Sequence, residues 1–242
     1  MKIIVVDNYE ELSAKAAELV AETVKGKADC VLGLATGDTP VGTYKNLIKM
    51  YESGELDFSG VRSVNLDEYY PISPDNDQSY RYFMNRQLFD HVNIDKANTY
   101  VPDGTVSDFE AHCKAYDDNI DALGGIDIQI LGIGRNGHIG FNEPDDTLVR
   151  GTHLTSLTAN TIEANSRFFA SEDEVPKHAL TMGIESVFKA RKILLLASGA
   201  GKAEAIRATV KGNIDPRCPA SMLCLHRDVV IICDKAAYSL VD

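Results

Sequence analysis

Short apolar runs alternate with longer amphipathic stretches along this chain. The apolar runs are rich in branched aliphatic side chains and predict buried strands at residues 2–6, 30–35, 61–66, 126–133, 192–197, 222–225 and 229–233. Apolar side chains at helical spacing predict helices at residues 9–25, 40–51, 79–92, 106–123 and 202–211. This alternation favours an α/β fold of the Rossmann-like, doubly wound type, with a mostly parallel sheet and helices on both of its faces.

Two of the predicted helices carry capping signals at their first residues. Asn8 is placed to cap the first helix. Ser107, with Glu110 three residues later, has the pattern of a capping box for the helix at 106–123. Pro40 stands near the first position of the second helix, where its fixed backbone angle is tolerated. These signals support the predicted boundaries.

The stretch at 145–190 is less regular than the rest of the chain. Short helices are expected there at 160–168 and 178–188. This polar, broken stretch fits a lid beside a site, although a surface excursion is the simpler interpretation. Because the composition does not change along the chain and no repeat is present, we expect one domain over residues 1–242.

The composition is that of an ordinary globular protein, with 44% hydrophobic and 25% charged residues and a net charge of −12. Such an acidic chain argues against nucleic-acid binding, but a few local cations can still hold a small anionic substrate. No apolar run reaches the roughly 18 residues of a membrane helix, and the short, soon acidic N-terminus is unlike a signal peptide. We therefore expect a cytoplasmic protein without a membrane partner.

The five cysteines include no CxxC pair, so buried thiols are expected.

The most distinctive loop covers residues 132–144 and follows the apolar run 126–133. It combines four glycines with His138, Glu143 and two asparagines. Glycine lets a backbone turn sharply and approach a ligand closely, and His and Glu are proton-transfer groups. The glycine spacing also matches a dinucleotide fingerprint, but no helical face follows it. A catalytic loop is therefore favoured over a nicotinamide site.

Two strand-to-helix turns have the composition of a phosphate site. Residues 198–202 place Lys202 at a helix start after a glycine-rich turn, although two mismatches to the P-loop pattern argue against a nucleoside triphosphate. Residues 36–40 offer hydroxyl and N–H groups. From these stretches alone, a solvated lysine and a capped connection are the competing interpretations. Asp38 would repel a phosphate unless its side chain points away.

Acidic side chains follow the apolar run at 61–66. Asp67 or Glu68 can supply a general base, although carboxylates at a strand end are more often solvated. His138 and Glu143 are too few to make a metal site without a third ligand, so no metal is expected. Because the carboxyl ends of parallel strands share one edge of a sheet, we expect convergence of the loops that follow residues 35, 66, 133 and 197.

Taken together, these stretches resemble the glucosamine-6-phosphate deaminase family of sugar-phosphate isomerases. The resemblance runs nearly end to end and rests on residues 34–40, 65–69, 132–144, 164–169 and Lys202. It implies the conversion of D-glucosamine 6-phosphate and water to D-fructose 6-phosphate and ammonium, in N-acetylglucosamine catabolism. It implies an amino sugar phosphate as the small-molecule partner, and neither a metal nor an organic cofactor.

The resemblance also implies roles for individual residues. His138 would take the proton from the anomeric hydroxyl and open the sugar ring, with Glu143 orienting its imidazole. Asp67 would then move a proton between C2 and C1 through an enolamine. Asn136, which stands where many members have Asp, would be a ring-opening residue. The substrate phosphate would be held by Gly37, Asp38, Thr39, Arg167 and Lys202.

The family resemblance also bears on the lid, the assembly state and the rival functions. It implies an active-site lid at 145–182. Long members regulated by N-acetylglucosamine 6-phosphate carry a C-terminal extension, so a monomer or small homo-oligomer without allosteric activation is expected here. A 6-phosphogluconolactonase has a related fold but needs no base poised at carbon, so residues 65–69 and 138–144 favour the deaminase. A sugar-phosphate-sensing domain would need a DNA-binding segment, and the sequence shows no basic one.

Overall fold

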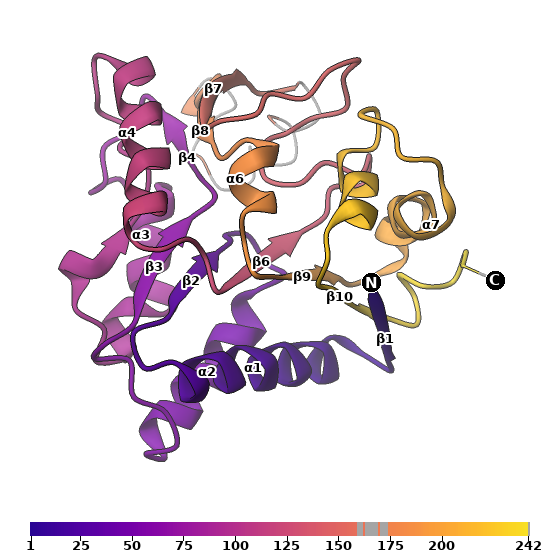
Figure 1. Cartoon of the computed structure of the whole chain (residues 1–242), viewed down its shortest axis with the longest axis horizontal. Helices are drawn as coiled ribbons and strands as arrows, with labels where there is room; N and C mark the ends of the chain where they lie inside the picture. Colours follow the sequence, from indigo (N-terminus) through magenta and orange to yellow (C-terminus); the bar gives the residue numbers. More distant parts are fainter. Residues whose placement is uncertain (159–161, 163–168, 170–173, 242) are drawn as a thin grey trace.

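The central feature of the molecule is a parallel sheet that runs through its middle (Figure 1). The computed structural model describes residues 1–158, 162, 169 and 174–241. The sheet has seven strands in the order β1-β10-β9-β6-β2-β3-β5, and every neighbouring pair runs parallel. Its strands are β1 (Lys2–Val6), β2 (Val31–Leu34), β3 (Arg62–Asn65), β5 (Thr99–Tyr100), β6 (Ile128–Gly132), β9 (Lys192–Ala197) and β10 (Val229–Asp234).

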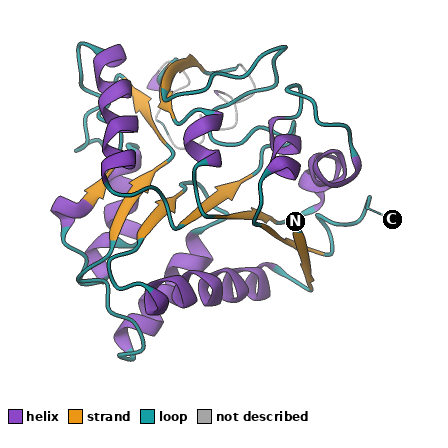
Figure 2. Cartoon of the chain, viewed as in Figure 1, coloured by secondary structure: helices purple, strands orange, loops and turns teal. Residues whose placement is uncertain are grey.

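Helices cover both faces of this sheet, which confirms the predicted doubly wound arrangement (Figure 2). Helices α1 and α2 lie on one face, and α4, α6 and α7 lie on the other (Figure 1). Because both faces are covered, every residue of β2 and of β10 is buried. The helices are α1 (Tyr9–Gly26), α2 (Val41–Glu52), α3 (Tyr80–Gln87), α4 (Phe109–Ala122), α6 (Ile184–Phe188) and α7 (Ala203–Lys211). Short 3-10 turns are η1 (Phe89–His91), η2 (Lys96–Asn98), η4 (Ala200–Lys202) and η5 (Pro219–Leu225).

Helix α1 shows how the local signals set the fold. Its cap is Asn8, as predicted, and the Asn8 side chain accepts a hydrogen bond from the backbone N–H of Glu11 at 2.9 Å. The buried face of α1 includes Leu12, Ala16 and Val20, which are completely inaccessible to solvent. This face packs on the sheet and on α2, so the spacing of apolar positions in the sequence places the helix correctly.

A second, antiparallel sheet was not predicted. It has three strands in the order β4-β8-β7, with bounds Asp67–Tyr70, His178–Thr181 and His153–Ser156. Strand β4 follows β3 after a single residue, Leu66, so the chain passes directly from one sheet to the other. The helix predicted at 178–188 is wrong in its first half, because residues 178–181 pair with β4. Only residues 184–188, after Gly183, are helical.

Three further boundaries differ from the prediction. Helix α4 is capped by Asp108, whose side chain accepts from the N–H of Ala111 at 3.0 Å, so the predicted capping box at Ser107 is wrong. The apolar run at 222–225 is part of the 3-10 turn η5, because Pro219 starts a tight turn there. The helix predicted at 79–92 ends at residue 87 and continues as η1. Most of the helix predicted at 160–168 lies outside the described residues.

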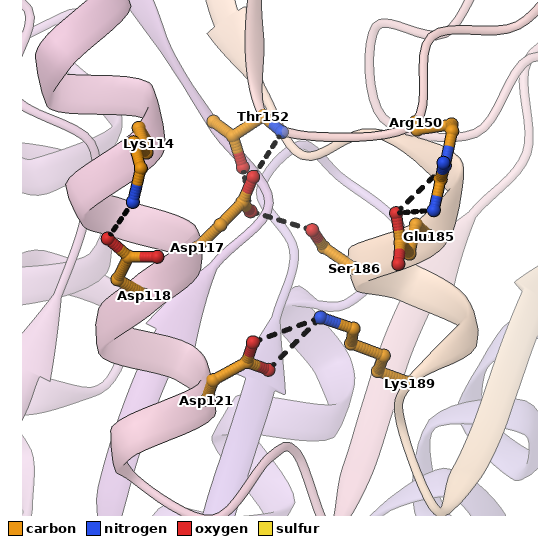
Figure 3. A network of polar contacts seen from close by, with 9 residues as sticks. All are labelled: Lys114, Asp117, Asp118, Asp121, Arg150, Thr152, Glu185, Ser186 and Lys189. Carbon is orange, nitrogen blue, oxygen red and sulfur yellow. Dashed lines mark hydrogen bonds and ion pairs between the residues drawn. The ribbon is translucent and has the colours of Figure 1, made fainter.

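A polar network attaches the second sheet to α4 (Figure 3). The carboxylate of Asp117 accepts from the backbone N–H and the hydroxyl of Thr152, at 2.8 and 2.6 Å, and from the hydroxyl of Ser186 at 2.7 Å. One turn away, Lys189 donates to Asp121. Thr152 precedes β7 and Ser186 lies in α6, so a single helix holds both ends of the segment between them.

The remaining expectations from composition concern thiols and membrane helices. Cys30, Cys113 and Cys233 are buried, as predicted, but Cys224 is exposed and Cys218 is partly exposed, so the prediction is wrong for these two. In the described part of the chain, every helix is too short or too polar to cross a membrane.

Candidate active site

The four loops that were expected to converge do so at one edge of the parallel sheet. The ammonium group of Lys202, after β9, donates to the carbonyl of Ile133, after β6, at 2.7 Å. A cavity of about 690 Å³ is lined by Thr39, after β2, and by Ser198, after β9. A methyl group on Gly140 would lie 3.6 Å from Oδ2 of Asp67, after β3. The predicted convergence is therefore confirmed.

Asp67 is a buried carboxylate at the junction of the two sheets. It is the first residue of β4, is paired in register with Thr181, and is only 6% exposed. Burial, and then the charge of Glu68, raises the pKa of Asp67 to about 8. A carboxylate with a pKa in this range is a much stronger base than a solvated one, and it titrates near neutral pH.

Glu68, the neighbouring carboxylate, has a different environment. Its oxygens accept hydrogen bonds from the backbone N–H groups of Tyr69, Tyr80 and Arg81 at 2.8–2.9 Å. Two of these N–H groups belong to the first turn of α3, where such donors are otherwise unpaired. Burial raises the pKa of Glu68 to about 7, and the three donors offset part of that rise. Glu68 therefore anchors α3 to β4, which leaves Asp67 as the candidate base.

His138 and Glu143 face each other across the glycine-rich loop. Nδ1 of His138 lies 3.2 Å from Oε2 of Glu143, within ion-pair range, although it makes no aligned hydrogen bond with any described residue. The same oxygen of Glu143 accepts from the amide of Asn136 at 2.7 Å. The carbonyl oxygen of the Asn136 side chain accepts from the backbone N–H of His138 at 3.2 Å. Asn136 thus holds both partners, and the carboxylate can orient the imidazole.

Glycine is required at two positions of this loop for different reasons. Gly134 lies directly beneath the imidazole, and a methyl group there would come within 2.3–2.5 Å of three ring atoms of His138. Gly140 adopts a φ of 57°, a left-handed conformation that side chains disfavour, and leaves room beside Asp67. The glycines that the sequence emphasised therefore serve close approach around the two candidate proton-transfer groups.

The turn at 37–39, predicted to bind phosphate, is held by Tyr9 from α1. The hydroxyl of Tyr9 donates to the backbone carbonyl of Asp38 at 2.9 Å and accepts from the N–H of Gly42 at 2.8 Å. Gly37 has a φ of 86°, which shapes the turn. Gly37 and Asp38 are exposed and Thr39 is half-buried, so the backbone of this turn is open at the edge of the sheet.

The turn before Lys202 is held by a residue that sequence reasoning missed. The carboxylate of Asp234 accepts from the hydroxyl of Ser198 at 2.6 Å and from the N–H of Gly199 at 2.9 Å. Asp234 ends β10, so its place at the carboxyl end of a strand was the available signal. Burial, and then the charge of Arg135, lowers the pKa of Lys202. Lys202 is thus a partly desolvated cation in a fixed turn.

The remaining predicted phosphate ligand is Arg167, which lies outside the described residues. Within those residues, no group of three or more His, Cys, Asp and Glu side chains is arranged to hold a metal ion. The site therefore consists of a buried carboxylate, an imidazole with its carboxylate and amide partners, and one lysine beside two open turns.

Comparison with known proteins places this site in a family. Residues 7–232 match the family described as glucosamine-6-phosphate isomerases/6-phosphogluconolactonase. A glucosamine-6-phosphate deaminase of Clostridium perfringens (strain 13 / Type A) is 57% identical over 241 residues, which cover 100% of both chains. The deaminase of Thermoanaerobacter sp. (strain X514) is 56% identical over 100% of this chain and 95% of its own.

Solved structures give the same result. A monomeric glucosamine-6-phosphate deaminase of the NagB superfamily is 48% identical, covers 99% of this chain and 100% of its own, and superposes with a TM-score of 0.96. A 6-phosphogluconolactonase from Thermotoga maritima shares the fold at 20% identity and a TM-score of 0.73, over 97% and 99% of the two chains. The chain belongs to the glucosamine-6-phosphate isomerase/6-phosphogluconolactonase family.

Proposed function

We propose that this chain catalyses the reaction of D-glucosamine 6-phosphate with water to give D-fructose 6-phosphate and ammonium. The high identity to named deaminases over the full chain supports this activity. The site supports it independently, because an amino aldose isomerisation needs one base at oxygen and another at carbon. The observation that carries the proposal is the buried Asp67, with a pKa of about 8, beside the loop that bears His138.

The first step assigned to this site is opening of the sugar ring. The imidazole of His138 accepts the proton of the anomeric hydroxyl, the bond between C1 and the ring oxygen breaks, and the ring oxygen takes a proton. Glu143 faces Nδ1 of the ring and favours the imidazolium that forms. Asn136 fixes the Glu143 carboxylate. Their geometry and the family resemblance support these proposed roles.

The second step is proton transfer at carbon. The carboxylate of Asp67 removes the proton from C2 of the open-chain aldehyde while the aldehyde oxygen takes a proton, which gives an enolamine. Asp67 then returns its proton to C1, which leaves an iminium group at C2. Water adds to this iminium carbon, and the resulting carbinolamine breaks its C2–N bond, which releases ammonia and leaves the ketone. A buried base of high pKa suits this step because removing a proton from carbon demands more basicity than a solvated carboxylate has. The substrate ammonium group beside C2 would favour the ionised form of Asp67 on binding.

The phosphate lies at the far end of the substrate from C1 and C2. We assign it to Lys202 and to the turn formed by Gly37, Asp38 and Thr39, with Arg167 as the further ligand that the family resemblance implies. Because the phosphate does not react, its binding energy positions C2 against the base. Replacing Lys202 by Ala should therefore raise KM chiefly.

The decisive experiment is ammonium release from D-glucosamine 6-phosphate by the purified chain, with fructose 6-phosphate as the measured co-product. Ammonium release by the wild type, and its loss in Asp67→Asn, would support both the deaminase activity and the assignment of Asp67 as the base that acts at carbon. Hydrolysis of 6-phosphogluconolactone without ammonium release would instead assign the chain to the other branch of its family.

Because a 48% identical relative is described as monomeric, we also propose that this chain is a single-domain protein and a monomer. Light scattering, which measures molecular mass in solution, tests the monomer.

A further inference from the structure

A second cation lies beside Lys202, on a residue to which no role has yet been given. Arg135 follows Gly134 in the glycine-rich loop, and its side chain is exposed. Its guanidinium reaches the turn before α7, where a methyl group on Gly201 would lie 3.5 Å from Nε of Arg135. The same turn carries Lys202, whose ammonium group donates to the carbonyl of Ile133, two residues before Arg135. Two positive side chains from different loops therefore meet at the carboxyl edge of the sheet.

Several basic residues of this chain lie beside a carboxylate. Lys189 and Arg150 each have a carboxylate partner, Asp121 and Glu185, at 3.0 Å. Among the described residues, neither Arg135 nor Lys202 has one. This contrast occurs in a chain with a net charge of −12, where carboxylates are abundant. Adjacent like charges are unfavourable unless an anion binds between them.

We propose that Arg135 is a second cation of the phosphate subsite and binds the substrate phosphate together with Lys202. This inference rests on the proposed function, because it assumes that Lys202 contacts the phosphate. A phosphate monoester carries a charge of about −2 at neutral pH, so two cations match it where one does not. A guanidinium adds planar, paired donors that a lysine cannot supply. Arg135 thus favours the dianion over the monoanion.

The test measures binding of inorganic phosphate to the full chain by calorimetry, with three variants. Arg135→Gln removes the charge, Arg135→Lys keeps it, and Arg207→Gln is the matched control. Arg207 is an exposed arginine on α7 that pairs with Glu204 at 3.5 Å, so its replacement changes the net charge equally without touching the turn. The same proteins are then assayed for KM and kcat with D-glucosamine 6-phosphate.

Arg135→Gln is expected to raise the Kd for inorganic phosphate and the KM about tenfold, with a much smaller change in kcat, as the loss of one charge-assisted contact predicts. Arg135→Lys should recover most of this loss, and Arg207→Gln should match the wild type. Raising the salt concentration should weaken phosphate binding less in Arg135→Gln than in the wild type.

Two results would overturn the inference. One is phosphate affinity in Arg135→Gln within twofold of that in Arg207→Gln, and the other is no phosphate binding by the wild type at millimolar concentrations. Calorimetry does not depend on turnover, so the role of Arg135 and the proposed deaminase activity can be refuted independently. Arg135-dependent phosphate binding in a wild type that releases no ammonium would leave this inference standing and overturn the proposed function.

Discussion

Asp67→Asn should stabilise the folded chain as it abolishes turnover. The pKa of Asp67 is about 8 when folded, against an ordinary value of 3.8. Between these pH values the folded state holds a proton that the unfolded chain has released, so the free energy of unfolding falls as pH rises from about 4 to about 8. Asparagine stays neutral throughout. The variant should therefore gain stability over the wild type as pH rises through this window.

The magnitude follows from the same pKa values. Because one pKa unit corresponds to about 1.4 kcal/mol, the move from 3.8 to about 8 sets a ceiling of about 6 kcal/mol at pH 8 and above. Water and neighbouring groups relax around an ionised buried carboxylate. The expected gain in the free energy of unfolding is therefore below this ceiling, at about 1–3 kcal/mol. Near pH 4 the gain should be close to zero, because Asp67 is then mostly neutral when folded and half neutral when unfolded.

Urea denaturation at about pH 5 and about pH 8 gives both free energies of unfolding. Glu68→Gln is a comparison variant, because Glu68 is also buried, with a pKa raised to about 7, but it accepts three backbone hydrogen bonds. An amide presents a donor where the carboxylate accepted, so this variant should lose about 2–4 kcal/mol. If the difference between Asp67→Asn and the wild type were the same at both pH values, Asp67 would not be a carboxylate of raised pKa and the reasoning would be refuted.

Three further variants test the glycine-rich loop and the polar network that attaches the second sheet to α4. Gly134→Ala should lower kcat more than about 100-fold while the chain stays folded by circular dichroism, because the methyl group would displace the His138 ring by more than an ångström. Asn136→Ala should lower kcat about tenfold with little change in KM, since Glu143 loses the amide that fixes it; equal turnover in the variant would remove Asn136 from the site. Asp117→Ala should cost about 2–4 kcal/mol in urea denaturation, because three donors lose their acceptor, and an unchanged midpoint would contradict the network.

The sequence predicted six of the seven strands of the parallel sheet, because most of them lie in apolar runs, but it missed the two-residue edge strand β5. It could not predict the second sheet. The residues of β4, Asp67–Tyr70, are acidic and aromatic and show no alternation, and they become a strand only because β8 pairs with them from more than 100 positions away. Short strands of this kind depend on their partners more than on their own composition.

In the site, too, the sequence indicates some residues directly, whereas the contacts of others depend on the folded structure. The sequence drew attention to Asp67 and His138 because strand ends and glycine-rich loops are informative positions in this fold. Their neighbours were harder to interpret, since Asp67 and Glu68 are chemically alike and only the three N–H groups around Glu68 separate their roles. The contacts of Asn136 and Arg135 depend on the conformation of one loop, which the order of residues does not specify.

The attachment of the second sheet to α4 has a consequence for how the molecule opens. Asp117 holds Thr152 before β7 and Ser186 after β8, so these two strands are attached close to one point on α4. Strands attached in this way can exchange with solvent as a separate cooperative unit. Native-state hydrogen exchange should therefore show the amides of β7, β8 and α4 opening together, at a lower free energy than those of β6 and β9. Asp67, on β4, lies on the boundary between this unit and the stable sheet.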